Sequence, residues 1–157
     1  MRPLALLGLM TLALVGCGKH PKDAALQASF QRNYLALSNI VTELKAVPKV
    51  ERVEWDGAAI IVGNSQTNPP TTLTPKLVPH FKAIGQPLLV TSASDASQVW
   101  FYFSRRGLSV GGSMKGIIYQ ETIPNRIVQD TDVSSRTNAP FTVFRPLQTN
   151  WFIFYSR

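Results

Sequence analysis

Cys17 is the residue of this 157-residue chain whose chemistry is most tightly constrained by its surroundings. It is the only cysteine, so no intrachain disulfide can form and the thiol is free for another reaction. Leu14-Val15-Gly16 precede it, at the end of an apolar run over residues 4–15 that follows Arg2. Such a run is typical of a cleaved export signal and is shorter than the roughly 18 residues that span a membrane. The sequence therefore predicts export, with a cut beside the thiol.

The segment Leu14-Val15-Gly16-Cys17 resembles the lipobox of bacterial lipoprotein precursors. The resemblance covers residues 1–17 and implies that residues 1–16 are a signal peptide that is removed. It also implies that the Cys17 sulfur carries diacylglycerol and that the new amino terminus gains a further acyl chain. Two or more acyl chains hold a protein durably on a membrane. We expect no cofactor besides this lipid.

The residues that follow the lipobox bear on location. Gly18 stands where enteric lipoproteins kept in the inner membrane carry aspartate, so the resemblance implies the periplasmic face of the outer membrane. In a Gram-positive cell it would imply the outer face of the single membrane. We expect residues 17–23 to form a short lipidated tether, in which Lys19 and Lys22 can contact head groups for about 1 kcal/mol each. Residues 24–157 then form one domain close to the membrane.

Ser109 is the residue with the best local context for a nucleophile. Residues 107–111 read Gly-Leu-Ser-Val-Gly, which matches the G-x-S-x-G turn of α/β-hydrolases, after a predicted strand. That family places an acid and then a histidine after the serine, but His20 and His80 both precede it. The glycines around it suit a hairpin connection. We expect a protein that is not an enzyme, with an envelope hydrolase using Ser109 as the alternative.

Two carboxylates could hold a hard cation. Asp130 and Asp132 are two residues apart, but calcium needs six to eight oxygen ligands, so the sequence predicts no metal site. The formal charge is +7, with basic residues scattered along the chain and Arg105-Arg106 the only adjacent pair. Scattered charge on an exported protein argues against nucleic acid as a partner.

A helix and a set of strands must position these residues. The helix follows the tether, since apolar residues recur at spacings of three and four before Pro48, and we expect it to cover one face of a sheet. A second, short helix ending at Gly85 is expected, with Pro79 limiting its length. Alternation and turn residues predict strands at 50–55, 58–62, 87–91, 98–104, 115–122, 141–144 and 151–155. The fold class is α+β, with about six to seven mostly antiparallel strands.

Two of these strands carry bulky apolar residues on both faces. Alternation places Trp100 and Tyr102 opposite Val99, Phe101 and Phe103, and it places Trp151 and Tyr155 opposite Phe152 and Phe154. Such strands are usually buried on both sides. Where one face stays open, Trp and Tyr are the residues that bind partners while tolerating water. The candidate partner-binding residues are therefore Trp100, Tyr102, Trp151 and Tyr155.

These features favour a lipid-anchored envelope protein with a binding or accessory role toward an envelope protein. A hydrolase with Ser109 as nucleophile and a carrier with a small-ligand cavity under the first helix are the two alternatives.

Overall fold

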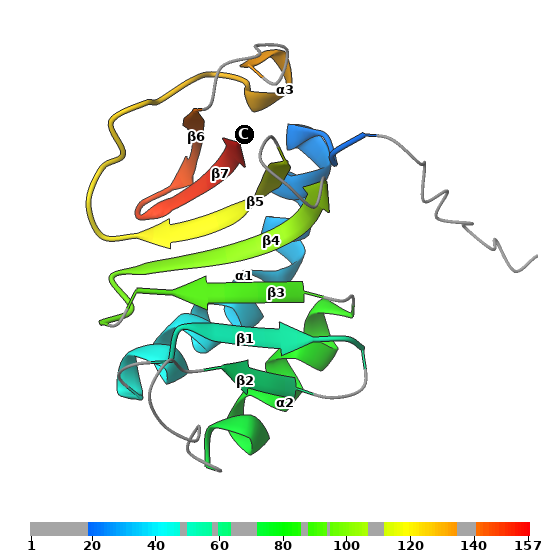
Figure 1. Ribbon diagram of the computed structural model, residues 1–157, viewed down its shortest axis with the longest axis vertical. Coiled ribbons are helices and arrows are strands. Elements are labelled where there is room, and N and C mark those ends of the chain that lie inside the picture. Colours follow the sequence, from blue (N-terminus) through cyan, green and yellow to red (C-terminus); the bar gives the residue numbers. More distant parts are fainter. Residues whose placement is uncertain are drawn as a thin grey trace, which may run out of the picture.

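One antiparallel sheet of seven strands forms the main layer of the molecule (Figure 1). The computed structural model describes residues 19–47, 50–57, 60–63, 72–85, 88–93, 95–106, 112–134 and 141–157. The strands are β1 (Arg52–Trp55), β2 (Ile60–Gly63), β3 (Leu88–Ser92), β4 (Gln98–Arg106), β5 (Ser113–Gln120), β6 (Thr142–Gln148) and β7 (Trp151–Ser156). Their order is β2-β1-β3-β4-β5-β7-β6, and each neighbouring pair is antiparallel. The α+β prediction is confirmed.

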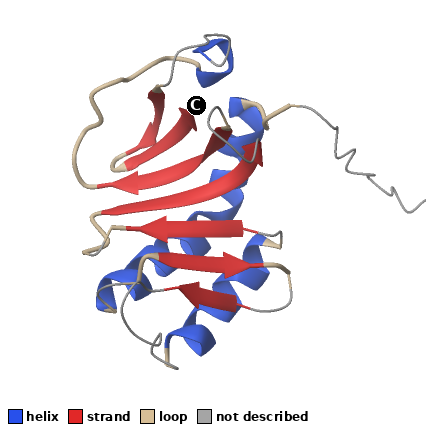
Figure 2. Cartoon of the chain, in the orientation of Figure 1, coloured by secondary structure: helices blue, strands red, loops and turns tan. Residues whose placement is uncertain are grey.

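Two long helices, α1 (Asp23–Ala46) and α2 (Leu73–Ile84), lie on the same face of this sheet (Figure 2). A four-residue helix, α3 (Thr131–Ser134), lies beside the start of α1. Among the described residues, no helix covers the opposite face, which we call the helix-free face. The molecule is therefore two layers thick, with its main core between the sheet and the two long helices.

The core forms because helix and strand periodicities converge on that interface. Strand alternation points Val90, Phe101 and Ile117 at the helices, and all three are fully buried. Burying each such side chain stabilises the fold by about 1.5–3 kcal/mol. The helices contribute a matching set of buried residues: Leu26, Phe30, Leu37, Ile40, Val41 and Leu44 from α1, and Leu73, Leu77, Phe81 and Ile84 from α2.

The helices differ from expectation in two details. Tyr34 follows Phe30 by four residues and so falls in the apolar stripe of α1, but its side chain is 42% exposed, with its ring against Phe30 and Trp151 at the edge of the interface. In α2, Pro79 lies inside the helix rather than bounding it, so one backbone hydrogen bond is lost without ending the helix. Gly85 ends α2 with φ +72°, as its position after the last helical residue predicts. Pro48 lies outside the described residues.

The strands match the predicted ones closely. Gly57 has φ +107° in the connection between β1 and β2, which fits a hairpin at this point. The largest difference is β6, which continues through Pro146 to Gln148. Pro146 is tolerated beside an irregularity in the pairing with β7.

Candidate functional site

Four aromatic side chains meet on the helix-free face. Trp100 and Tyr102 come from β4, Phe144 from β6 and Phe154 from β7, and we call these four the aromatic cluster. The ring of Trp100 lies 4.8 Å from that of Phe154, edge to face, and 6.5 Å from that of Tyr102, nearly parallel to it. Phe154 is fully buried beneath the other three, which are half-buried. The cluster is therefore a packed patch whose outer rings remain open to a partner.

A glycine makes this packing possible. Gly116 lies on β5 between its register partners, Tyr102 on β4 and Phe154 on β7. A Cβ at this position would lie 1.9 Å from the carbonyl oxygen of Phe101 and 3.0 Å from Cε1 of Phe154. Because Gly116 has a hydrogen in place of Cβ, strand β4 and the ring of Phe154 can pack directly against β5 at this point.

Two shallow hollows flank the aromatic cluster, each about 360 Å³ in volume. Gln98, Trp100 and Phe144 line one of them, and Glu54, Leu89 and Tyr102 line the other. The hydroxyl groups of Tyr102 and Thr91 are hydrogen-bonded at 3.1 Å. A surface with aromatic rings, amides and small hollows is suited to contact with a protein partner.

The four candidate partner-binding residues divide between the two faces of the sheet. Trp151 and Tyr155 are each 3% exposed and point toward the helices, where Trp151 contacts Phe30 of α1 at a ring distance of 5.3 Å. They belong to the core, so these two of the four candidate residues are not open to a partner. Trp100 and Tyr102 remain as candidate partner contacts.

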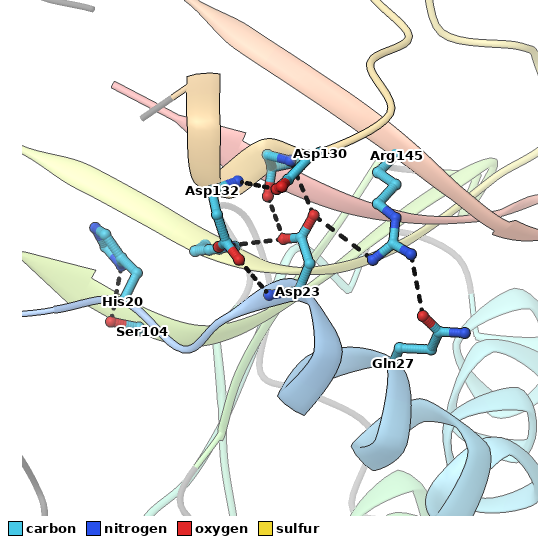
Figure 3. Close-up of polar contacts among 9 residues, drawn as sticks. His20, Asp23, Gln27, Ser104, Asp130, Asp132 and Arg145 are labelled. Atoms are coloured by element: carbon cyan, nitrogen blue, oxygen red, sulfur yellow. Dashed lines mark hydrogen bonds and ion pairs between the residues drawn. The ribbon is translucent and has the colours of Figure 1, made fainter. Parts of the chain in front are cut away.

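The tether is bound to the domain rather than projecting from it. The Nδ1 atom of His20 lies 2.9 Å from the hydroxyl of Ser104 on β4 (Figure 3), and its Nε2 atom lies 2.6 Å from the hydroxyl of Ser113 on β5. The ring of Tyr155 packs against the His20 ring, edge to face, with 5.5 Å between the two ring centroids. A neutral imidazole satisfies this arrangement, since one nitrogen donates to a serine and the other accepts.

Burial and the charges of Arg106 and Lys115 together lower the pKa of His20 to about 4. An undocked His20 has the ordinary value of about 6.5, so it takes up a proton at a pH where the docked ring stays neutral. Docking is therefore complete above pH 6.5 and weakens as the pH falls from about 6.5 toward 4. We expect NMR titration of the His20 ring to give a midpoint near 4, and a midpoint near 6.5 would contradict the docked geometry. His20→Gln should remove this pH dependence of the stability.

Just beyond His20, Lys115 is a buried cation in the middle of a polar group that we call the Lys115 cluster: Asp23, Gln27, Lys115, Asp130, Thr131, Asp132 and Arg145 (Figure 3). Its Nζ lies 2.7 Å from Asp23 and also pairs with Asp132, while its side chain is only 2% exposed. Arg145 lies 3.6 Å from Asp23 and donates to Gln27 at 3.1 Å. Two cations thus face three carboxylates within the cluster.

The starts of α1 and α3 cap each other through the same cluster. The Asp23 carboxylate accepts hydrogen bonds from the backbone N–H of Thr131, at 2.8 Å, and from its hydroxyl. In return, the Asp132 carboxylate accepts from the backbone N–H of Asp23 at 3.1 Å. Each helix thereby receives a carboxylate at its positive end. Burial opposes ionisation of Asp23, but the bonds from Lys115 and Thr131 and the charge of Lys115 outweigh it and hold its pKa below the usual range.

The acidic residues of this cluster do not need a metal ion. Oxygens of Asp23, Asp130 and Asp132 lie within 4.8 Å of one another. Lys115 pairs directly with two of these carboxylates, so its ammonium group supplies the positive charge that a bound cation would otherwise provide. The arrangement is a structural ion-pair network.

The lipidation candidate Cys17, the predicted signal peptide over residues 1–16 and the nucleophile candidate Ser109 lie outside the described residues. The histidine–serine contacts that the structure does contain involve His20, which lies in the tether predicted over residues 17–23. Lys115 was also missed, although alternation along β5 places it on the same face as the apolar Ile117. A lysine at an inward position is the signal that could have indicated a buried ion pair.

None of the helices in the described part of the chain is long and apolar enough to cross a membrane. Comparison with protein-family models, curated proteins and solved structures finds no match for this chain.

Proposed function

We propose that this protein is a lipid-anchored accessory protein of the bacterial envelope that binds an envelope protein through its helix-free face. The observation that carries the binding role is the aromatic cluster, whose outer rings, Trp100 and Tyr102, are only partly buried on a sheet face that no described helix covers. The lipobox resemblance at residues 14–17 supports the anchor on Cys17. The outer membrane is the expected location in a Gram-negative cell, with the domain in the periplasm.

The accessory role is favoured over catalysis by the chemistry around His20. Its two ring nitrogens are engaged by serine hydroxyls, and its low pKa makes it a weak base at neutral pH. Within the described residues, no carboxylate orients this histidine as a base in a nucleophilic triad would require. The contacts of His20 therefore support a structural role in holding the tether.

The binding role is tested by replacing Trp100 or Tyr102 with a photocrosslinking amino acid in the full-length protein inside cells. We expect both positions to crosslink to the same envelope protein, while Tyr34, exposed on the helix side of the molecule, serves as the matched control. Trp100→Ala should weaken binding of that partner by about 2 kcal/mol or more, roughly 30-fold in Kd. Unchanged affinity in a Trp100→Ala protein of normal stability would remove the helix-free face as the binding site.

The anchor is tested by mass spectrometry of the amino-terminal peptide of the membrane-extracted protein. We expect that peptide to begin at Cys17 and to carry acyl chains, and Cys17→Ser to abolish both cleavage and lipid. An unmodified peptide would show that the anchor is wrong without bearing on the binding face.

A further inference from the structure

We infer that the docked tether seats the domain with the β4–β5 end of its sheet on anionic lipid head groups. This inference rests on the proposed acylation of Cys17 and adds to it a defined orientation and a lipid chemistry. It follows from three observations: the position at which the tether is held, the charges around that position, and the direction in which the strands run.

The tether is held close to the lipidated residue. His20 contacts Ser104 near the end of β4 and Ser113 at the start of β5. Only three residue steps separate His20 from Cys17, so an extended chain places the two Cα atoms at most about 11 Å apart. Because the acyl chains lie in the bilayer, the head groups must lie within a similar distance of the β4–β5 end.

The charges around this end suit an anionic surface. Lys19, Lys22 and Arg105 are exposed, and Arg106 is half-buried. None of these four cations forms an ion pair with a residue that the structure describes. The carboxylates of the neighbouring Lys115 cluster include Asp23 and Asp132, which are already paired with Lys115. Clustered basic residues beside a lipid anchor attract anionic head groups, and the attraction is screened by salt.

The directions of the strands then determine which surfaces of the domain face away from the membrane. β4 runs toward this end and terminates at Arg106, and β7 runs the same way and terminates near the carboxyl end of the chain (Figure 1). The strands therefore run toward the membrane, with the ends of β4 and β7 nearest to it. Neither face of the sheet contacts the bilayer in this orientation. The aromatic cluster faces parallel to the membrane plane, where it can meet partners held in the same membrane.

The test uses the full-length lipidated protein reconstituted into vesicles. Cys17 is the only native cysteine and its sulfur is acylated, so an introduced cysteine is the only free thiol. One fluorophore is placed at Ala24→Cys, in the first turn of α1, and another at Thr149→Cys, in the β6–β7 turn at the opposite end of the strands. Energy transfer to a lipid-borne acceptor reports which position lies nearer the membrane.

We expect higher transfer from position 24 than from position 149 in vesicles of phosphatidylglycerol and phosphatidylcholine. The difference should shrink in pure phosphatidylcholine and on adding salt. Lys19→Glu/Arg105→Glu should reduce it at least to its value in pure phosphatidylcholine while the protein stays on the vesicles. The control Arg32→Glu/Arg126→Glu makes the same change of net charge at exposed positions outside the tether and the β4–β5 end, and it should leave the difference intact.

Equal transfer from the two positions, or the same difference in pure phosphatidylcholine, would overturn the seating on anionic lipid. If the acylated protein remains bound to vesicles in either case, the anchor still stands and only the orientation is wrong. If the amino-terminal peptide carries no lipid, the anchor and the seating fall together.

Discussion

Lys115→Ala is expected to destabilise the domain by about 3–5 kcal/mol, because it takes from a buried carboxylate the nearer of its two positive partners and leaves only Arg145 at 3.6 Å. Asp23 is 4% exposed, and Lys115 supplies both a hydrogen bond and the nearest positive charge to it. The measurement is urea unfolding at neutral pH. Lys45→Ala is the matched control, since Lys45 also pairs with a carboxylate, that of Glu121, but at the surface. Loss of that exposed pair should lower the free energy of unfolding by about 1 kcal/mol or less.

The same network makes stability depend on pH in a defined direction. The folded pKa of Asp23 lies below its ordinary unfolded value of about 3.9, so its contribution is complete above that value and is lost as the pH falls below it. In Lys115→Met the opposing effect of burial is no longer outweighed to the same degree, so the folded pKa of Asp23 rises toward its unfolded value and the acid-induced loss of stability should become smaller. A variant that unfolds with the wild-type pH profile would show that Lys115 does not hold the Asp23 charge. The pair Asp23→Leu/Lys115→Met should recover part of the lost stability, because it removes both buried charges together.

Gly116→Ala is expected to cost about 3 kcal/mol or more, at the upper end of the usual range for overpacking. The added Cβ would lie 1.9 Å from the backbone carbonyl oxygen of Phe101, which is fixed by the sheet and cannot rotate away as a side chain could. Strands β4 and β5 must therefore separate locally, which also disturbs the aromatic cluster. We expect a large drop in the urea midpoint and loss of the near-ultraviolet circular dichroism of the clustered rings.

Gly57→Ala separates this steric effect from ordinary glycine strain. Gly57 has φ +107° and nothing within 4 Å of a built Cβ, so alanine there meets only the backbone penalty of about 1–2 kcal/mol. The aromatic circular dichroism should be unchanged in that variant. If Gly57→Ala and Gly116→Ala lose the same amount of stability, the close approach of β4 and β5 is not the reason that residue 116 must be glycine.

Local patterns predict most of the elements of this fold. The spacing of apolar residues indicates α1, and alternation with turn residues indicates the seven strands, because each signal is contained within a short stretch of chain. What alternation cannot provide is the register between strands. Ile117 pairs with both Phe101 and Ile153, and this pairing places Trp151 on the helix side while Trp100 points to the other face. Without this register, the four candidate aromatic residues cannot be assigned to the correct faces of the sheet.

The Lys115 cluster could not be predicted for a related reason. Asp23 and Thr131 are 108 residues apart, and nothing in either segment indicates the other. In isolation, Asp130 and Asp132 have the appearance of solvated acids or a partial calcium site, whereas the structure gives Asp132 a lysine as its counter-ion. The position of Lys115 on the inward side of its strand was the only local signal.

If the protein is the exported lipoprotein that we propose, the mutual capping of α1 and α3 also has a consequence for the order of events during export. The residues that hold the tether follow it by 84 to 109 positions: Ser104 and Ser113 for His20, and Thr131 and Asp132 for Asp23. A precursor that crosses the membrane amino end first therefore presents its lipobox long before the sites that bind the tether have emerged. The acylation and cleavage that we propose at Cys17 have this whole interval in which to act on a segment that is not yet docked. Completion of the sheet and of α3 then draws the finished tether onto the domain, so that processing precedes docking.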